Sequence, residues 1–73
     1  MSEEIRAEMV ANVWKIVVKE GATVSDGDTL VILESMKMEI PLLAPRDGLV
    51  KEVRVQPGSP VRAGQCVVVL EEA

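Results

Sequence analysis

A 37-residue repeat is the feature that most constrains how this 73-residue chain can fold. When the sequence is shifted by 37 positions, segment 7–34 lies on segment 44–71, and both carry G-x-x-V-x-x-G followed by an apolar run. Glycines fixed on either side of one valine predict turns with positive φ and a valine that points inward. Two matching halves, neither able to bury its apolar face alone, predict a flattened antiparallel sandwich with pseudo-two-fold symmetry. The identical pairs are Ala7 and Ala44, Val13 and Val50, Val18 and Val55, Gly21 and Gly58, Val24 and Val61, Gly27 and Gly64, Val31 and Val68, Leu33 and Leu70, and Glu34 and Glu71.

Short apolar runs between turns rich in Gly, Pro and Asp predict an all-β fold. Apolar residues make up 48% of the chain and Trp14 is the single aromatic residue, a composition that favours strands. The length predicts one domain over residues 1–73. Segment 4–10 is a weaker strand candidate; a capped helix over residues 2–9 is disfavoured because so short a helix is marginal. The expected strands are 12–18, 29–35, 37–44, 48–55 and 66–72.

The charge and the residue types exclude several classes of function. A formal charge of -4 disfavours nucleic acid or an anionic membrane as the main partner and favours a basic protein surface. His is absent and so short a chain has no room for a sheltered cleft, so we expect neither an independent enzyme nor a metal site. Cys66, the single cysteine, is expected to be a reduced strand residue. The first residues form neither a signal peptide nor a membrane span, so the expected location is cytoplasmic.

The stretch ESMKMEIP, residues 34–41, lies at the junction of the two halves. If the apolar runs on either side of it are antiparallel neighbours, Met36, Lys37 and Met38 form the tip of the hairpin that joins them. Lys37 is then held in solvent on a tight turn. A single lysine at a hairpin tip is ordinarily a solvated charge, so the motif around it decides its meaning.

The residues around this lysine resemble those of a known family. ESMKMEIPLLAPRDG, with VKEGATVSDGD before it and VQPGSPVRAGQ after it, resembles the biotinyl/lipoyl attachment domain, and most of all the stand-alone biotin/lipoyl attachment proteins of the biotin carboxyl carrier type. The resemblance runs from about Ile5 to Glu71. It implies a flattened barrel-sandwich of two four-stranded antiparallel sheets. It also implies covalent attachment of biotin to Lys37, the lysine of M-K-M.

The same resemblance implies how the chain works. The chain is expected to be a carrier without catalytic machinery of its own, biotinylated by a biotin protein ligase. Its swinging arm is expected to shuttle carboxyl groups between biotin carboxylase and carboxyltransferase components. Met36 and Met38 are candidates for recognition by these partners, since unbranched thioethers repack readily, or for packing at the barrel rim. Glu34, Ser35 and Glu39 are candidate ligase contacts, and solvated strand ends are the alternative for the two glutamates.

Two other functions stay open on the sequence alone. One is a lipoyl carrier, and the other is an unmodified barrel-sandwich that acts only in protein interaction. The two methionines favour biotin, because lipoyl domains more often resemble D-K-A at this place.

The first half departs from the family pattern A-P-M-x-G. Residues 7–11 lack the proline and the glycine that the second half has at Pro45 and Gly48. A positive φ at Ala11 would be strained, so the first turn is expected to differ from the second. If Val13 points inward, Trp14 points outward, either as a partner contact or as a rim residue that covers the barrel end.

Overall fold

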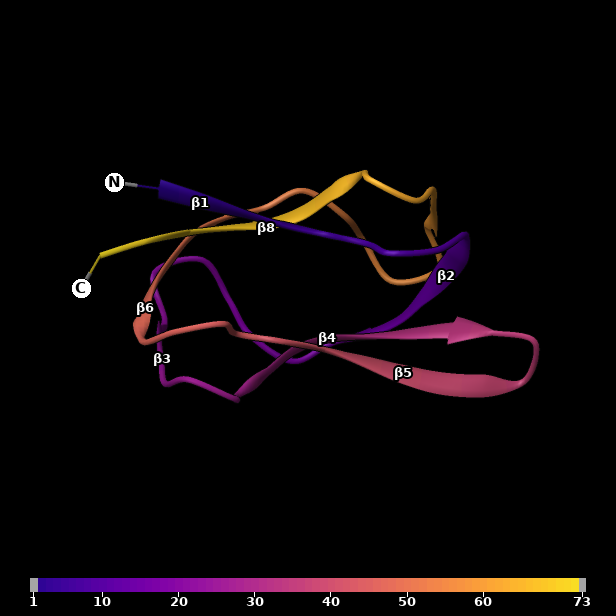
Figure 1. Ribbon diagram of the computed structural model, residues 1–73, viewed down its shortest axis with the longest axis horizontal. Helices are drawn as coiled ribbons and strands as arrows, with labels where there is room; N and C mark the ends of the chain where they lie inside the picture. Colours follow the sequence, from indigo (N-terminus) through magenta and orange to yellow (C-terminus); the bar gives the residue numbers. More distant parts are fainter. Residues whose placement is uncertain (1, 73) are drawn as a thin grey trace.

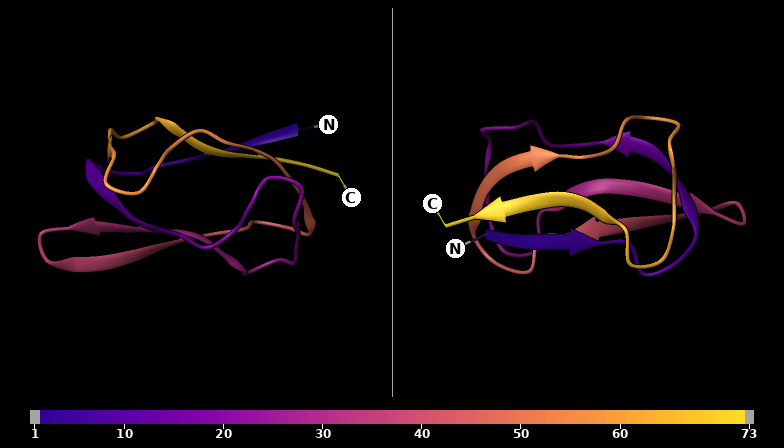
Figure 2. Two further views of the ribbon diagram at one scale, coloured as in Figure 1. Left: turned by 180° about the vertical axis from the view of Figure 1, so that it is seen from behind. Right: turned by 90° about the horizontal axis from the view of Figure 1, so that it is seen from above.

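Eight strands form two antiparallel sheets in the computed structural model, which describes residues 2–72 (Figure 1). The strand order is β1-β8-β6-β3 in one sheet and β5-β4-β2-β7 in the other. The sheets lie face to face, and the β4–β5 hairpin projects from the end opposite to the start of β1 (Figure 2). The strands are β1 Ser2–Arg6, β2 Ala11–Ile16, β3 Thr23–Val24, β4 Thr29–Ser35, β5 Met38–Leu43, β6 Gly48–Val53, β7 Pro60–Val61 and β8 Cys66–Glu71.

The predicted pseudo-two-fold symmetry is confirmed strand by strand. A shift of 37 positions carries β2 onto β6 and β3 onto β7, and it exchanges the two sheets. Hydrogen bonds between the halves come in matching pairs: the Gly21 N–H donates to the Val50 carbonyl, and the Gly58 N–H donates to the Val13 carbonyl. The register shift after Val13 in β2 recurs after Val50 in β6. The two halves therefore share one backbone design, down to their bulges.

The core lies between the two sheets and is built from aliphatic side chains of both halves. Val24 and Val61, the valines between the paired glycines, are buried as predicted. Gly21 and Gly58 have φ values of 90° and 87°, which an L side chain adopts only with strain. The buried residues are Ile5, Ala7, Ala11, Val13, Val24, Leu30, Val31, Leu33, Ala44, Val50, Val55, Val61, Val67, Val68, Val69 and Leu70.

Several expected boundaries differ from the structure. The segment that begins at Ser2 is the strand β1, so the alternative helix over residues 2–9 is wrong. Strands β2 and β6 end at Ile16 and Val53, two residues earlier than expected. The two-residue strands β3 and β7 were not predicted from the residues, because a pair of residues carries no readable alternation.

The expectation that the first turn differs from the second is also wrong, because residues 7–10 and 44–47 follow the same pattern of bends. Neither Ala11 nor Gly48 has a positive φ, since each opens a strand in extended conformation. Gly48 has a different requirement: a Cβ on it would lie 2.8 Å from the Glu71 carbonyl oxygen. The two turns thus follow similar paths although their sequences differ.

Candidate attachment site

A two-residue loop closes the β4–β5 hairpin. Ser35 pairs with Met38 across the hairpin, which leaves Met36 and Lys37 as the loop. Their φ values are 53° and 65°, and a type I′ turn requires positive φ at both central residues. The hairpin tip is therefore one residue shorter than expected, because Met38 already belongs to β5.

This turn is an unfavourable one for its residues. Two-residue hairpin loops of this type usually hold Asn or Gly, and a left-handed φ costs other residues roughly 1–2 kcal/mol each. The pairing of β4 with β5 offsets that cost, because Leu33 is buried and Ile40, opposite it, packs against the core. The pairing of the two strands thus holds Met36 and Lys37 in a strained conformation.

Lys37 stands free in solvent at this turn. Its side chain is exposed, and within residues 2–72 it forms no ion pair. The pairing of β2 with β4 begins at Asn12 and Glu34, so the tip of the hairpin extends past the N-terminal end of β2 (Figure 1). A primary amine that is exposed, unpaired and fixed on a tight turn fits covalent attachment through an amide.

The other predicted site residues surround the turn on different sides. Met36 is 91% exposed and Met38 is 64% exposed, so neither packs closely against the sandwich. Glu34 and Glu39 are exposed and form a cross-strand pair, while Ser35 is half-buried. The alternation along β4 places Glu34 and Glu39 on the outer face of the sheet, because Leu33 and Ile40 face the core.

A hollow of about 330 Å³ lies beside Lys37. Its walls include Val10, Asn12 and Pro60 in addition to the hairpin residues Glu34, Ser35, Met36 and Lys37. Sequence reasoning missed Val10, Asn12 and Pro60 as neighbours of the lysine. They meet there because β2 pairs with β4 on one side and with β7 on the other. One signal existed: Val10 occupies the position that Asp47 holds in the second half.

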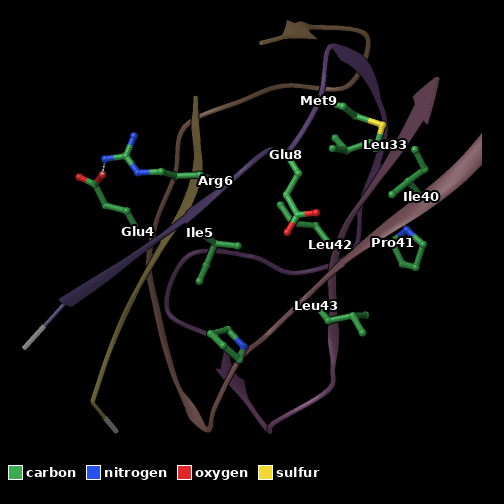
Figure 3. A pocket seen from close by; sticks show the side chains of 11 residues that line it. Glu4, Ile5, Arg6, Glu8, Met9, Leu33, Ile40, Pro41, Leu42 and Leu43 are labelled. Carbon is green, nitrogen blue, oxygen red and sulfur yellow. Dashed lines mark hydrogen bonds and ion pairs between the residues drawn. The ribbon is translucent and has the colours of Figure 1, made fainter. Parts of the chain in front are cut away.

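A larger groove, of about 390 Å³, lies between the edge strands β1 and β5 and does not include Lys37 (Figure 3). Ile5 from β1 and Leu42 from β5, which match in the repeat, both line it. The groove is therefore the open seam between the sheets at the pseudo-two-fold axis. Met9, Leu33 and Ile40 lie together at one end of it in Figure 3.

Cys66 is a half-buried strand residue at the start of β8. Its thiol lies 3.7 Å from the Val68 carbonyl oxygen, and burial raises the pKa of the thiol. A raised pKa keeps the thiol protonated and poorly nucleophilic. Within residues 2–72, no group of three His, Cys, Asp or Glu side chains is placed to hold a metal ion. The same part of the chain has no helix with the length and apolar character needed to cross a membrane.

Comparison with known families identifies the kind of domain that carries this turn. The family model for biotin and lipoyl attachment, described as "Biotin-requiring enzyme", matches residues 3–70. The chain belongs to the biotin/lipoyl attachment family. Two relatives of this family are short proteins of similar extent. The "Biotinylated protein TB7.3 homolog" of Mycobacterium leprae is 50% identical over 70 residues, covering 96% of this chain and 99% of the relative. The "Biotin/lipoyl attachment protein" of Bacillus subtilis is 42% identical over 69 residues, which is 94% of each chain.

The biotin/lipoyl attachment fold also recurs inside much larger enzymes. The solved structure of a single-chain, multi-domain long-chain acyl-CoA carboxylase superposes with a TM-score of 0.92 and 33% identity. The match covers 99% of this chain and 7% of that chain. The predicted fold, two four-stranded antiparallel sheets in a barrel-sandwich, is therefore confirmed and is shared with part of a carboxylase.

Proposed function

We propose that Lys37 is biotinylated by a biotin protein ligase and that the chain carries carboxyl groups for a biotin-dependent carboxylase. The observation that carries this proposal is an exposed lysine, unpaired within residues 2–72, on a strained two-residue turn of a biotin/lipoyl family member. When bound, biotin supplies a ring nitrogen that accepts and releases a carboxyl group. The chain supplies the amine, its placement and the surface that partners recognise.

The turn explains how one lysine is selected among four. Lys15 and Lys51 lie on strands and Lys19 lies just after β2, whereas Lys37 has a backbone fixed at positive φ on a projecting hairpin. A fixed backbone limits the orientations of the amine, and such pre-organisation contributes several kcal/mol to effective reactivity. The ligase therefore has only to bind the tip of the hairpin to reach this amine.

The residues around the turn have roles under the same proposal. Met36 and Met38 present exposed, flexible thioethers that repack against different partner surfaces. Glu34, Ser35 and Glu39 are proposed ligase contacts, and the two carboxylates favour a basic surface on the ligase. Conversion of the Lys37 ammonium to an amide removes its charge and leaves an apolar linker beside the methionines.

Biotin is favoured over lipoate because relatives of this chain are named biotinylated proteins, the one from Mycobacterium leprae among them. The Bacillus subtilis relative is named a biotin/lipoyl attachment protein, so lipoylation is the second candidate. We propose biotin carboxylase and carboxyltransferase components as further partners, because part of a carboxylase shares the fold. The cytoplasmic location and a single carrier domain over residues 1–73 stay predictions.

The test is expression of the chain with a biotin protein ligase and, separately, with a lipoate ligase, followed by intact mass measurement and a denatured streptavidin blot. We expect one biotin per chain, and none in Lys37→Arg, since a guanidinium stays protonated and does not act as the nucleophile. An unmodified wild-type chain in the presence of ligase and biotin contradicts the proposal. Labelling that persists in Lys37→Arg shows that another lysine is used.

A further inference from the structure

Within residues 2–72, the large apolar residues that are exposed lie on or next to the sheet that carries Lys37, β5-β4-β2-β7. Large apolar residues are exposed at positions 9, 10, 14, 17, 36, 38 and 43, on β2, on β5 and on the segments next to them. For five of these residues, the position 37 residues away lies within residues 2–72 and can be compared. A charged residue occupies each of those five positions. The pairs are Met9 and Arg46, Val10 and Asp47, Trp14 and Lys51, Val17 and Arg54, and Leu43 and Arg6.

This asymmetry does not come from the fold. The two halves share strands, bulges and hydrogen bonds, and the other sheet, β1-β8-β6-β3, forms the same backbone with charged side chains at these positions. Val10 is 70% exposed and Trp14 is 51% exposed, so neither is needed to fill the core. Exposed apolar groups that gather on one sheet, without a packing role, mark a surface used for association.

Distance along the strands separates these residues into two groups. Val10 lines the same hollow as Lys37. Trp14 lies in the bulge between Val13 and Lys15. Their partners Leu33 and Ile32 precede Ser35, at the base of the turn, by two and three positions, or roughly 7–10 Å at the rise of a strand. The Val17 N–H donates to the Leu30 carbonyl, five positions before Ser35 and roughly 17 Å from it along the strand, and the turn lies beyond Ser35. A standard interface buries about 800 Å² per partner, a disc of about 16 Å radius. An interface centred on Lys37 therefore covers Val10 and Trp14 but not Val17.

The reach of lysine identifies the partner. Its four-carbon stem carries the amine only about 6 Å from the backbone. An enzyme that acts on the bare amine must therefore approach the hairpin closely and cover the residues next to it. An enzyme that acts at the end of the longer biotinylated arm has no such requirement.

We infer that Val10 and Trp14, together with Met36, form the docking surface for the biotin protein ligase. This inference rests on the proposed biotinylation of Lys37 and extends it from the hairpin to β2. Asn12 and Trp14 share the exposed face of β2, and Glu34 pairs with Asn12 on that face. The matching ligase surface has an apolar depression for Trp14 and basic residues that face Glu34.

The repeat supplies variants that the backbone already accommodates. Val10→Asp and Trp14→Lys install the residues found at positions 47 and 51, and together they leave the net charge unchanged. We expect the double variant to raise the KM of the ligase for the protein substrate about tenfold or more, because buried interface aromatics dominate binding. The kcat is expected to stay within about twofold, since Lys37 and its turn are intact.

Val17→Arg is the matched control for Trp14→Lys. Each adds one positive charge and installs its repeat counterpart, but position 17 lies outside the expected interface. We expect Val17→Arg to leave KM within about twofold of the wild type. Thermal unfolding of each variant checks that the fold is retained.

A second measurement does not depend on turnover. A photo-crosslinking residue is placed at position 14 or at position 17 of the full chain carrying Lys37→Arg, and the ligase is added. We expect a crosslink from position 14 and none from position 17.

The outcomes are distinguishable. A wild-type KM in the double variant, or an equal rise in KM for Val17→Arg, overturns the docking surface while biotinylation of Lys37 stands. Equal crosslinking from both positions overturns it as well. A wild-type chain that the ligase does not modify overturns the proposed function and the docking surface together.

Discussion

Glu34 and Glu39 face each other directly across the β4–β5 hairpin, with only the paired residues Ser35 and Met38 between them and the turn. Both carboxylates are exposed on the same face. Like charges directly opposite each other in an antiparallel pair are destabilising. The corresponding pair in the other sheet is Ser2 and Glu71, so the fold does not require two carboxylates there. The arrangement lowers stability and concentrates negative charge beside Lys37.

Glu39→Gln is expected to raise the free energy of unfolding by about 0.2–1 kcal/mol, because it removes this cross-strand repulsion. Urea denaturation at low ionic strength measures the gain, and added salt is expected to reduce it. Glu8→Gln removes one exposed carboxylate elsewhere and is the matched control. An equal gain in the control would attribute the effect to net charge and not to the pair.

Met36→Gly is expected to stabilise the protein by about 0.5–1 kcal/mol, because glycine relieves the left-handed strain while adding freedom to the unfolded chain. Met36→Val is expected to destabilise it, since a β-branched side chain tolerates a φ of 53° poorly. Denaturant titration of both variants gives the comparison. Equal stabilities would mean that the loop does not hold the positive φ in solution.

Moving the lysine by one position is expected to reduce biotinylation sharply. Exchange of the residues at 36 and 37, or at 37 and 38, keeps the composition but reorients the amine, and a misplacement of about 1 Å costs about 100-fold in rate. A time course of intact mass under limiting ligase measures the loss. The two variants have the same composition, so each is a control for the other. A wild-type rate of biotinylation in either variant would contradict the selection of Lys37 by the turn.

Cys66 is expected to react slowly with iodoacetamide near neutral pH. Burial raises the pKa of the thiol, so the thiolate fraction in the folded chain is below that of a free cysteine. The raised pKa also makes the free energy of unfolding depend on pH, because the folded state favours the protonated thiol. The contribution of Cys66 to stability is present below the unfolded pKa and is lost as pH rises through the folded pKa. An alkylation rate plotted against pH gives the midpoint. A midpoint at or below that of a free thiol would contradict the burial of this side chain.

The repeat made most of the fold predictable. Glycines recur at one spacing around an inward valine, and turns with positive φ leave few residue choices, so Gly21 and Gly58 fixed the bends correctly. The alternation around Val13 likewise predicted that Trp14 points outward. Strand ends were not predictable: the Val17 and Arg54 N–H groups still donate to the partner strands at Leu30 and Val67, beyond the last residues of β2 and β6. The two-residue strands were not predictable because two residues show no alternation.

The site was predictable at its centre but not around it. The motif located Lys37 at a turn, since the sequence placed it between two apolar runs. The neighbours Val10 and Pro60 were out of reach, because they arrive through the pairing of β2 with β7 across the two halves. Only the contrast between Val10 and Asp47 in the repeat hinted at them.

The pseudo-two-fold axis has a consequence for how the lysine turn arises. The symmetry that carries β4 and β5 onto β8 and β1 places the counterpart of the turn between Glu71 and Ser2, where no peptide bond joins the strands. A homodimer of two separate half-chains would enclose the same kind of core. It would have chain ends both at the position of the Lys37 turn and at its counterpart between Glu71 and Ser2. The covalent link that makes assembly intramolecular is thus the segment that presents the amine. A circular permutant opened at Lys37 and closed between Glu71 and Ser2 would keep the sandwich but would no longer hold the lysine on a closed turn.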